Sequence, residues 1–268
     1  MEILMKLPPH RNIVQLQYFS ADPIVDEENA RLLALVMDYL PTTLQEVIQE
    51  YATGMPLSLV QIYAGQLLSA LAHLSDRNIV HRDVLPRNIL IDQRDKRLKL
   101  ADFGCAKLIT PNSVNHPHVG SWQYRAIELL FGATHYSTKA GTLTNLGVLF
   151  LDIWSASVII LEMVSGQYPF PETSEDRVLD KIYTVLGPVS VDQVRDMGLD
   201  PLDFPHLLAG SLFNARRWSD IEAFPKTQSN ELRSLLNEGL EYSPRRRADA
   251  ATLLNHQFFK TDYTSPNQ

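Results

Sequence analysis

Apolar and polar positions divide the chain into an early part that favours strands and a later part that favours helices. Residues 13–19 alternate and predict a strand, and the more apolar stretch 32–37 predicts a second one across an acidic link at residues 22–29. One or two helical turns are expected before them, ending at Pro8 and Pro9. A further short strand pair is predicted at residues 89–92 and 98–101.

Helical periodicity dominates most of the remainder. Apolar residues recur every three or four positions from Leu57 to Leu74, which predicts a long buried helix, and Thr43 is expected to cap a shorter helix beginning near Leu44. Residues 102–128 have an irregular pattern. Further helices are predicted at residues 152–165, 176–185, 231–240 and 249–255. Strands first and helices afterwards predict an α+β fold, a small sheet unit followed by a mainly helical one.

Composition narrows the classes of partner. A net charge of −7 over 268 residues argues against nucleic acid or anionic lipid as the main partner, because both attract basic surfaces. The single cysteine, Cys105, cannot form an intrachain disulfide, and no Cys/His set has zinc-ligand spacing. With neither a signal-peptide pattern nor eighteen uninterrupted apolar residues, we expect no membrane span and an intracellular protein.

The stretch from His81 to Asn88 carries the clearest chemistry. It contains Asp83 and Asn88, and Asp102 follows further along the chain. Transfer of a phosphoryl group from Mg-ATP to a hydroxyl needs one carboxylate that orients the hydroxyl and accepts its proton, which we assign to Asp83. It also needs oxygen ligands for the metal ions that bridge the phosphates, which we assign to Asn88 and Asp102. The alternative is an ordinary loop with one histidine and two aspartates.

The motif resembles the catalytic loop of protein kinases, H-R-D-L-x-x-x-N, with Val84 in place of the leucine. A D-F-G tripeptide follows at residues 102–104, and Ala-Ile-Glu at 126–128 stands where A-P-E belongs. The chain is more closely similar to the glycogen synthase kinase-3 (shaggy-like) branch, in four segments: 10–14 (HRNIV), 35–39 (LVMDY), 98–107 (LKLADFGCAK) and 124–134 (YRAIELLFGAT). The similarity runs from the first residues to about Phe259.

The resemblance implies a bilobal, protein-kinase-like fold. Residues 1–40 would form a truncated, β-rich N-lobe with the end of a helix and two or three strands. Residues 41–260 would form a helical C-lobe with the catalytic loop and activation segment, and residues 261–268 a tail. The resemblance also implies ATP and Mg²⁺ as cofactors, protein substrates phosphorylated on Ser or Thr, candidate scaffold partners on the C-lobe, and a cytoplasmic location with the nucleus as a second compartment.

Four residues would form the nucleotide site by this resemblance. Met37 corresponds to the gatekeeper, the backbone of Asp38 and Leu40 to the adenine-binding hinge, and Leu90 to the apolar floor under the adenine. For these apolar residues, plain core packing is the alternative.

The resemblance assigns five further positions to substrate binding and structure. Lys107 would bind a phosphate already present on the substrate, with a solvated surface lysine as the alternative. Ser121 would lie near the catalytic aspartate and favour Ser/Thr substrates. Asp152 would anchor the catalytic-loop backbone, and Arg247 would pair with Glu128.

The sequence departs from the family pattern near its start and in the catalytic loop. It has no glycine-rich loop or V-A-I-K strand before residue 10. Leu85 replaces the lysine usually found two residues after the catalytic aspartate, and Arg87 is a candidate to supply the missing charge.

Further departures lie in the activation segment and beyond it. His118 replaces the tyrosine of the branch, and Trp122 replaces an arginine. Residues 140–150 form an apolar stretch that the branch lacks. The leading hypothesis is therefore an N-terminally incomplete serine/threonine kinase, in keeping with an imperfect gene model. The alternatives are an inactive pseudokinase scaffold and a fragment that does not fold.

Overall fold

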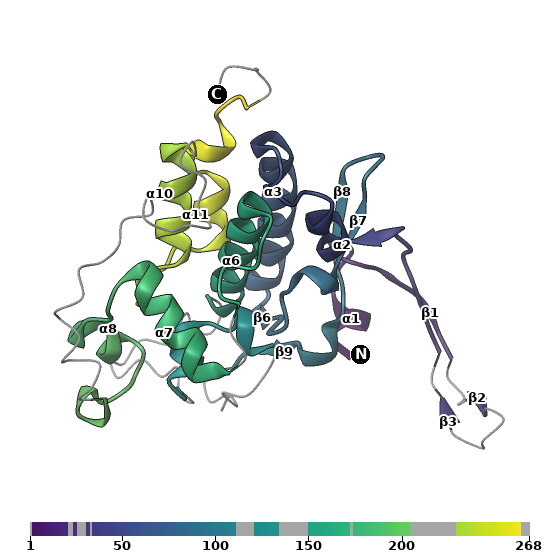
Figure 1. Ribbon diagram of the computed structural model, residues 1–268. Helices are drawn as coiled ribbons and strands as arrows, with labels where there is room; N and C mark the ends of the chain where they lie inside the picture. The colour runs from purple at the N-terminus through teal and green to yellow at the C-terminus, as the bar shows by residue number, and fades with distance from the viewer. Residues whose placement is uncertain are drawn as a thin grey trace.

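The computed structural model describes residues 2–20, 24–25, 31–32, 34–110, 121–133, 150–171, 174–204 and 229–263, with only the backbone at 24–25 and 31–32. Helix α1 (Glu2–Lys6) ends just before Pro8, as expected. Strand β1 (Leu16–Phe19) pairs antiparallel with β4 (Leu35–Met37). The short pair β2 (Ile24–Val25) and β3 (Arg31–Leu32) lies beyond them. Together these strands form a ribbon that projects away from the helical body (Figure 1).

A second, three-stranded sheet packs against the body. Its order is β5–β7–β8, formed by Thr42–Thr43, Ile89–Asp92 and Arg97–Leu100. β7 and β8 are an antiparallel hairpin in which Ile89 pairs with Leu100 and Asp92 with Arg97. A third pair joins β6 (Ile79–Val80) to β9 (Lys107–Leu108), so the segments on both sides of the catalytic loop and the D-F-G tripeptide are tied together.

Helix α2 (Leu44–Gln49) begins as the sequence predicts. Thr43 accepts a hydrogen bond from the backbone N–H of Glu46, and the Glu46 side chain accepts one from the backbone of Thr43, which completes a capping box. Helix α3 (Leu57–Ser75) matches the long predicted helix and buries Tyr63, Leu67 and Leu71. Among the described helices, α3 alone is long and apolar enough to cross a membrane, but it packs against α6 and α11 as the central helix of a core.

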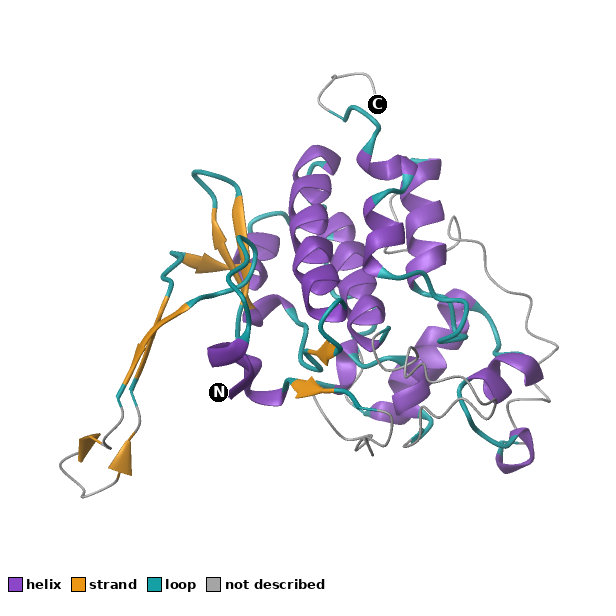
Figure 2. Ribbon diagram, turned by 180° about the vertical axis from the view of Figure 1, so that it is seen from behind, coloured by secondary structure: helices purple, strands orange, loops and turns teal. Residues whose placement is uncertain are grey.

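Helix α10 packs against α6 and α11, whereas α7 and α8 lie farther from α3 (Figures 1 and 2). All residues of α6 are buried, because this helix is apolar around most of its circumference. The described helices after residue 120 are α4 (Ile127–Leu130), α6 (Leu151–Ser165), α7 (Glu175–Leu186), α8 (Val191–Asp196), α10 (Asn230–Gly239) and α11 (Ala250–Leu254), with 3-10 turns η3 (Trp122–Tyr124), η4 (Pro201–Asp203) and η7 (Gln257–Phe259).

The structure corrects several predicted elements. The first predicted strand is shorter, since Ile13 forms a bridge to Leu100 and the Val14 N–H donates to the Leu100 carbonyl instead of extending β1. The strand predicted at 32–37 appears as β3 and β4. Residues 102–128, predicted as irregular, contain β9 and the two 3-10 turns η2 (Phe103–Cys105) and η3. Helix α8 was not predicted.

Candidate active site

The two predicted metal ligands meet because of the β7–β8 register. β7 begins at Ile89 and β8 ends at Leu100, and these two residues are paired in the antiparallel hairpin. Asn88 and Ala101 therefore leave the sheet at the same end, and the Ala101 N–H donates to the Asn88 carbonyl at 2.8 Å. Asp102, which follows Ala101, is exposed at this end of the hairpin.

Asp83 is held in place by hydrogen bonds from two segments. Asn88 Nδ2 donates to Asp83 Oδ2 at 2.8 Å and to the Asp83 carbonyl at 3.0 Å. The backbone N–H of Ser121 donates to Asp83 Oδ1 at 3.3 Å. Asp83 itself is partly exposed, whereas Asn88 is buried. The predicted base thus lies between one predicted metal ligand and the segment that would face a substrate.

Asp152 of α6 fixes the loop that carries Asp83. Asp152 Oδ2 accepts from the backbone N–H of His81 at 2.7 Å, and Oδ1 accepts from the backbone N–H of Arg82 at 2.9 Å. Arg82 has φ +66, an unfavourable conformation for a residue with a side chain, so these two bonds stabilise a strained turn. Burial raises the pKa of Asp152, although His81 and the two backbone bonds oppose the shift.

His81 joins this loop to the D-F-G segment. Its Nε2 lies 2.9 Å from the carbonyl oxygen of Ala101. The centroids of its ring and the Phe103 ring are 4.8 Å apart in a T-shaped arrangement. Burial lowers the pKa of His81, against the charge of Asp152, so the ring is neutral and must carry its proton on Nε2 to donate this bond. Its Nδ1 has no hydrogen-bond partner within the described ranges.

The residues around Asp102 fit a magnesium ion. Asp102 has φ +59, and its Oδ1 accepts from the Gly104 N–H at 3.1 Å, which orients the carboxylate while leaving it exposed. Asn88 donates through Nδ2, so its amide oxygen is the atom suited to a cation. Carboxylate and amide oxygens are the ligands that Mg²⁺ prefers. No cluster of three or more His, Cys, Asp or Glu side chains occurs in the described part of the chain, so Mg²⁺ would also need oxygens from a nucleotide or water.

The four residues predicted for nucleotide binding lie on neighbouring segments. Met37 ends β4 and is 39% exposed, so plain core packing, the alternative interpretation, does not describe it. Leu40 is buried, and Asp38 lies between them in sequence with its N–H donating to the Gln15 carbonyl at 3.2 Å. Leu90 is half-buried on β7, opposite Thr43 of β5.

The activation-segment residues are placed at both ends of an undescribed stretch. Lys107 is half-buried on β9 opposite Val80, and Ser121 contacts Asp83 as described above. Trp122 is half-buried against the core. His118 and residues 140–149 lie outside the described residues, so the predictions that concern them stay open.

Glu128 and Arg247 form a buried ion pair, as predicted. Arg247 Nη1 and Nη2 each lie 2.8 Å from one Glu128 oxygen, and both side chains are fully buried. The guanidinium also lies 5.2 Å from the ring centroid of Trp154 on α6. Removing one partner would leave a buried charge, which typically costs about 3–5 kcal/mol. The pair therefore fixes α4, at the end of the activation segment, to the helical body.

Leu85 and Arg87 occupy opposite environments in the catalytic loop. Leu85 is 3% exposed and belongs to the core, whereas Arg87 is exposed on the 3-10 turn η1 (Pro86–Asn88). A cation at position 85 would thus have to be buried, while Arg87 already presents one to solvent next to Asn88.

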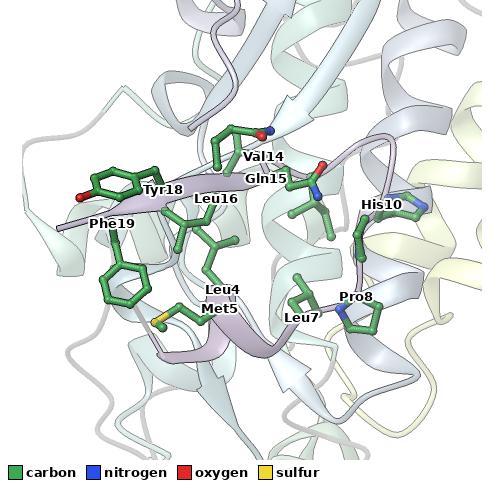
Figure 3. Close-up of a pocket in the computed structure, with 13 residues that line it drawn as sticks. Leu4, Met5, Leu7, Pro8, His10, Val14, Gln15, Leu16, Tyr18 and Phe19 are labelled. Atoms are coloured by element: carbon green, nitrogen blue, oxygen red, sulfur yellow. The ribbon is translucent and has the colours of Figure 1, made fainter. Parts of the chain in front are cut away.

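A cavity of about 360 Å³ lies away from these residues, between α1 and β1. Leu4 and Met5 of α1 face Leu16 and Phe19 of β1 across it (Figure 3). None of the predicted site residues lines this cavity, so it is not part of the candidate active site.

Sequence reasoning missed two groups near the site. Lys99 forms an ion pair with Asp38, and Glu162 of α6 accepts a hydrogen bond from the Tyr124 hydroxyl at 2.8 Å. A weak signal existed for both, because each is a charged residue inside an otherwise apolar stretch, residues 98–100 for Lys99 and residues 158–164 for Glu162. A charge in such a position requires a partner.

A loop with Asp83 and Asn88, joined to a D-F-G segment above a helical body, defines the catalytic core of a protein kinase. A family model described as the protein kinase domain matches residues 1–259. Protein kinase gsk31 of Schizosaccharomyces pombe is 34% identical over 261 residues, covering 96% of this chain and 63% of the relative. Glycogen synthase kinase 1 of Pyricularia oryzae is 34% identical over 263 residues, covering 96% of this chain and 61% of the relative.

The chain belongs to the protein kinase domain family. It spans about three-fifths of the length of the two relatives. The predicted resemblance to a kinase of the glycogen synthase kinase-3 type and the predicted α+β kinase-like fold, with small sheets and a mostly helical body, are confirmed. The family uses ATP and Mg²⁺ and acts on protein substrates.

Proposed function

We propose that this protein is a serine/threonine kinase that transfers the γ-phosphoryl group of ATP to a hydroxyl of a protein substrate. The position of Asp83 carries the proposal. Its carboxylate is held by Asn88 on one side and by the Ser121 N–H on the other, next to the strand end from which Asp102 emerges. The kinase names of the two relatives support it.

In this mechanism Asp83 orients the substrate hydroxyl and receives its proton. The hydrogen bond from Asn88 keeps one carboxylate oxygen fixed, and the bond from Ser121 fixes the other, so the base does not have to reorganise during the reaction. Asn88 and Asp102 would hold Mg²⁺, which when bound neutralises charge on the phosphates.

Residues around Asp83 would position the catalytic loop and the substrates. Asp152 keeps the strained backbone at Arg82 in place, and the Arg247–Glu128 pair holds the end of the activation segment. Met37, Asp38, Leu40 and Leu90 would bind the adenine, and Arg87 would supply a positive charge near the transferred group. Lys107 would contact a substrate phosphate, and the helical body would offer a surface for scaffold proteins.

The test is phosphotransfer with a matched substitution at Asp83. We expect Asp83→Asn to lower the rate of transfer from Mg-ATP to a Ser-containing protein substrate by roughly 10³-fold or more, because the variant keeps the shape of the side chain but cannot accept the proton. Radiolabel transfer measures this rate, and a magnesium-dependent thermal shift with ATP measures binding, which should be retained in the variant.

The control is Asp95→Asn, a carboxylate in the exposed β7–β8 turn, which should transfer at the wild-type rate. Equal transfer by wild type and Asp83→Asn, or no transfer by wild type despite Mg-ATP binding, would refute the proposal. The second outcome would favour a pseudokinase scaffold instead.

A further inference from the structure

We propose that Lys99 is a positioning residue for adenine binding: by holding the Asp38 carboxylate, it fixes the hinge backbone against the hairpin that leads to Asn88 and Asp102. This inference rests on the proposed function, because it concerns the same nucleotide site. It assigns a role to a side chain that neither the catalytic loop nor the D-F-G motif contains.

Lys99 is a cation on a mostly buried strand. It lies on β8 between Leu98 and Leu100, which are both buried. Its Nζ donates to Asp38 Oδ2 at 2.7 Å and to the Ile13 carbonyl at 3.3 Å. The two side chains of the ion pair are only 19% and 20% exposed, so the pair is screened less than a surface pair and has a fixed geometry.

The Asp38 carboxylate also accepts hydrogen bonds from Gln15 and Gln17. The Gln15 N–H donates to Oδ2 at 2.9 Å, and Gln17 Nε2 donates to Oδ1 at 2.9 Å. Burial by itself would raise the pKa of Asp38, but the bonds from Lys99, Gln15 and Gln17 outweigh it and hold the pKa below its usual value. The carboxylate is therefore ionised, and its hydrogen bonds connect Gln15 and Gln17 to Lys99 of β8.

The Lys99–Asp38 ion pair lies next to the residues proposed to contact adenine. The backbone of Asp38 and Leu40 is the proposed hinge, and Leu90, the proposed floor, is the cross-strand partner of Lys99 in the β7–β8 hairpin. Directly paired residues present their side chains on the same face of a sheet, so the lysine stem borders the floor residue while its ammonium group holds the hinge. Asp102 follows Lys99 by three residues, just beyond the end of β8.

Without the cation, Asp38 would keep only the uncharged donors Gln15 and Gln17, and no charged group among the described residues would link the hinge to β8. The hinge groups would then have to be ordered when the nucleotide binds, which lowers affinity because ordering costs entropy. A merely structural ion pair would instead lower the melting temperature and leave nucleotide affinity unchanged.

The experiment measures dissociation constants on the full chain with a fluorescent ADP analogue in the presence of Mg²⁺, and with adenosine as a competitor. We expect Lys99→Met to weaken ADP binding by roughly fivefold or more, the usual lower range of coupling between sites. Adenosine, which has no phosphates, should weaken by the same factor. Lys99→Arg should restore affinity to within about twofold, because it keeps the charge.

Two further variants identify the route. Asp38→Asn should reproduce the loss seen in Lys99→Met, and the double variant should lose no more than either single one, because both remove the same interaction. Arg97→Met is the control: Arg97 is also a cation on β8, but it pairs with Asp92 and Asp95 at the far end of the strand, and its removal should leave affinity unchanged.

Wild-type affinity in Lys99→Met overturns the positioning role and leaves the proposed kinase activity standing. Weakened ADP binding with unchanged adenosine binding also overturns it, because Lys99 would then act on the phosphates. An equal loss in Arg97→Met would show a general effect of charge on the strand. Absence of any adenine nucleotide binding by wild type would overturn this inference and the proposed function together.

Discussion

At the scale of single residues, the catalytic loop differs from the family pattern by the placement of one positive charge. Leu85 is buried where a lysine is usual, and Arg87 is exposed two residues later. Burial raises the pKa of Tyr124, and the positive charge of Arg87 opposes this shift. The charge is present in this loop, at a different residue.

We predict that Arg87→Met lowers kcat about 100–1,000-fold, the usual range for losing one group that stabilises charge in the transition state. The KM for ATP should change little if the arginine acts mainly on the transition state. Steady-state kinetics measure both constants. Arg94→Met, which removes an exposed cation from the β7–β8 turn, is the matched control and should leave kcat at the wild-type value.

The residues proposed to carry the chemistry could be selected from the sequence where a motif fixes their spacing. Asp83, Asn88 and Asp102 needed no tertiary information, because the hairpin between them brings its two ends together. The partners of Lys99 and Glu162 could not be identified, since Asp38 and Tyr124 lie far away along the chain and only the folded structure brings them near.

At the scale of elements, local capping signals were informative and tertiary pairings were not. Thr43 and Glu46 form the capping box that places the start of α2. Ser190 and Gln193 form another at the start of α8, a signal that was present in the sequence and not used. Strand β9 has only two residues and exists because it pairs with β6, so its own sequence could not reveal it.

Contacts of η3 with α6 and with Tyr168, which follows α6, show how one element positions another. The Tyr124 hydroxyl donates to Glu162 at 2.8 Å, the Ser155 hydroxyl donates to the Tyr124 carbonyl at 2.6 Å, and the Tyr168 hydroxyl donates to the Gln123 carbonyl. Glu162 is 8% exposed, and burial raises its pKa from 4.5 to about 7 despite the bond from Tyr124. The anchor of this segment therefore titrates near neutral pH.

This titration predicts a pH-dependent stability. The folded state holds the Glu162 proton more tightly than the unfolded chain between pH 4.5 and about 7, so this group's contribution to the free energy of unfolding falls as pH rises through that window and is constant above it. Glu162→Gln keeps an acceptor for Tyr124 and removes the charge. Relative to wild type it should gain stability as pH rises from 4.5 to about 7, by up to roughly 3 kcal/mol, since each pKa unit corresponds to about 1.36 kcal/mol.

Denaturant unfolding of both proteins across this pH range measures the difference. Glu175→Gln serves as the control, because Glu175 also bonds to the activation segment, through Arg125, but its side chain is 39% exposed. A stability difference between Glu162→Gln and wild type that does not change with pH would contradict the prediction.

At the scale of the whole molecule, the α+β order of the chain could be predicted, but the assembly of its helices could not. Helix α3 packs against α6 and α11, and Gln61 Nε2 donates to the carbonyls of Phe258 and Thr261 at 2.7 and 2.9 Å. The two Gln61 hydrogen bonds join segments some 200 residues apart. Periodicity shows that each helix has an apolar face, without showing which other helix covers it.

The ribbon projects away from the rest of the described structure (Figure 2). Tyr18 and Val36 are cross-strand partners on it and are 61% and 50% exposed, with Leu35 and Met37 nearby at 41% and 39%. Exposed apolar side chains on a two-stranded sheet with unpaired backbone groups along its edges favour association between molecules. A single exposed apolar residue does not by itself favour such association.

We therefore predict that the isolated chain self-associates reversibly through this ribbon, and that Tyr18→Thr combined with Val36→Lys suppresses the association by removing the apolar pair and adding a charge at the edge. Sedimentation velocity over a wide range of protein concentration should show a smaller weight-average mass for the double variant, with a melting temperature close to that of wild type because neither side chain belongs to the core. Leu202→Lys changes a side chain that is more exposed, at 81%, but lies on η4, away from the ribbon, and should associate like wild type. If Leu202→Lys suppressed association as strongly as the ribbon variant, added charge rather than the ribbon surface would be the cause.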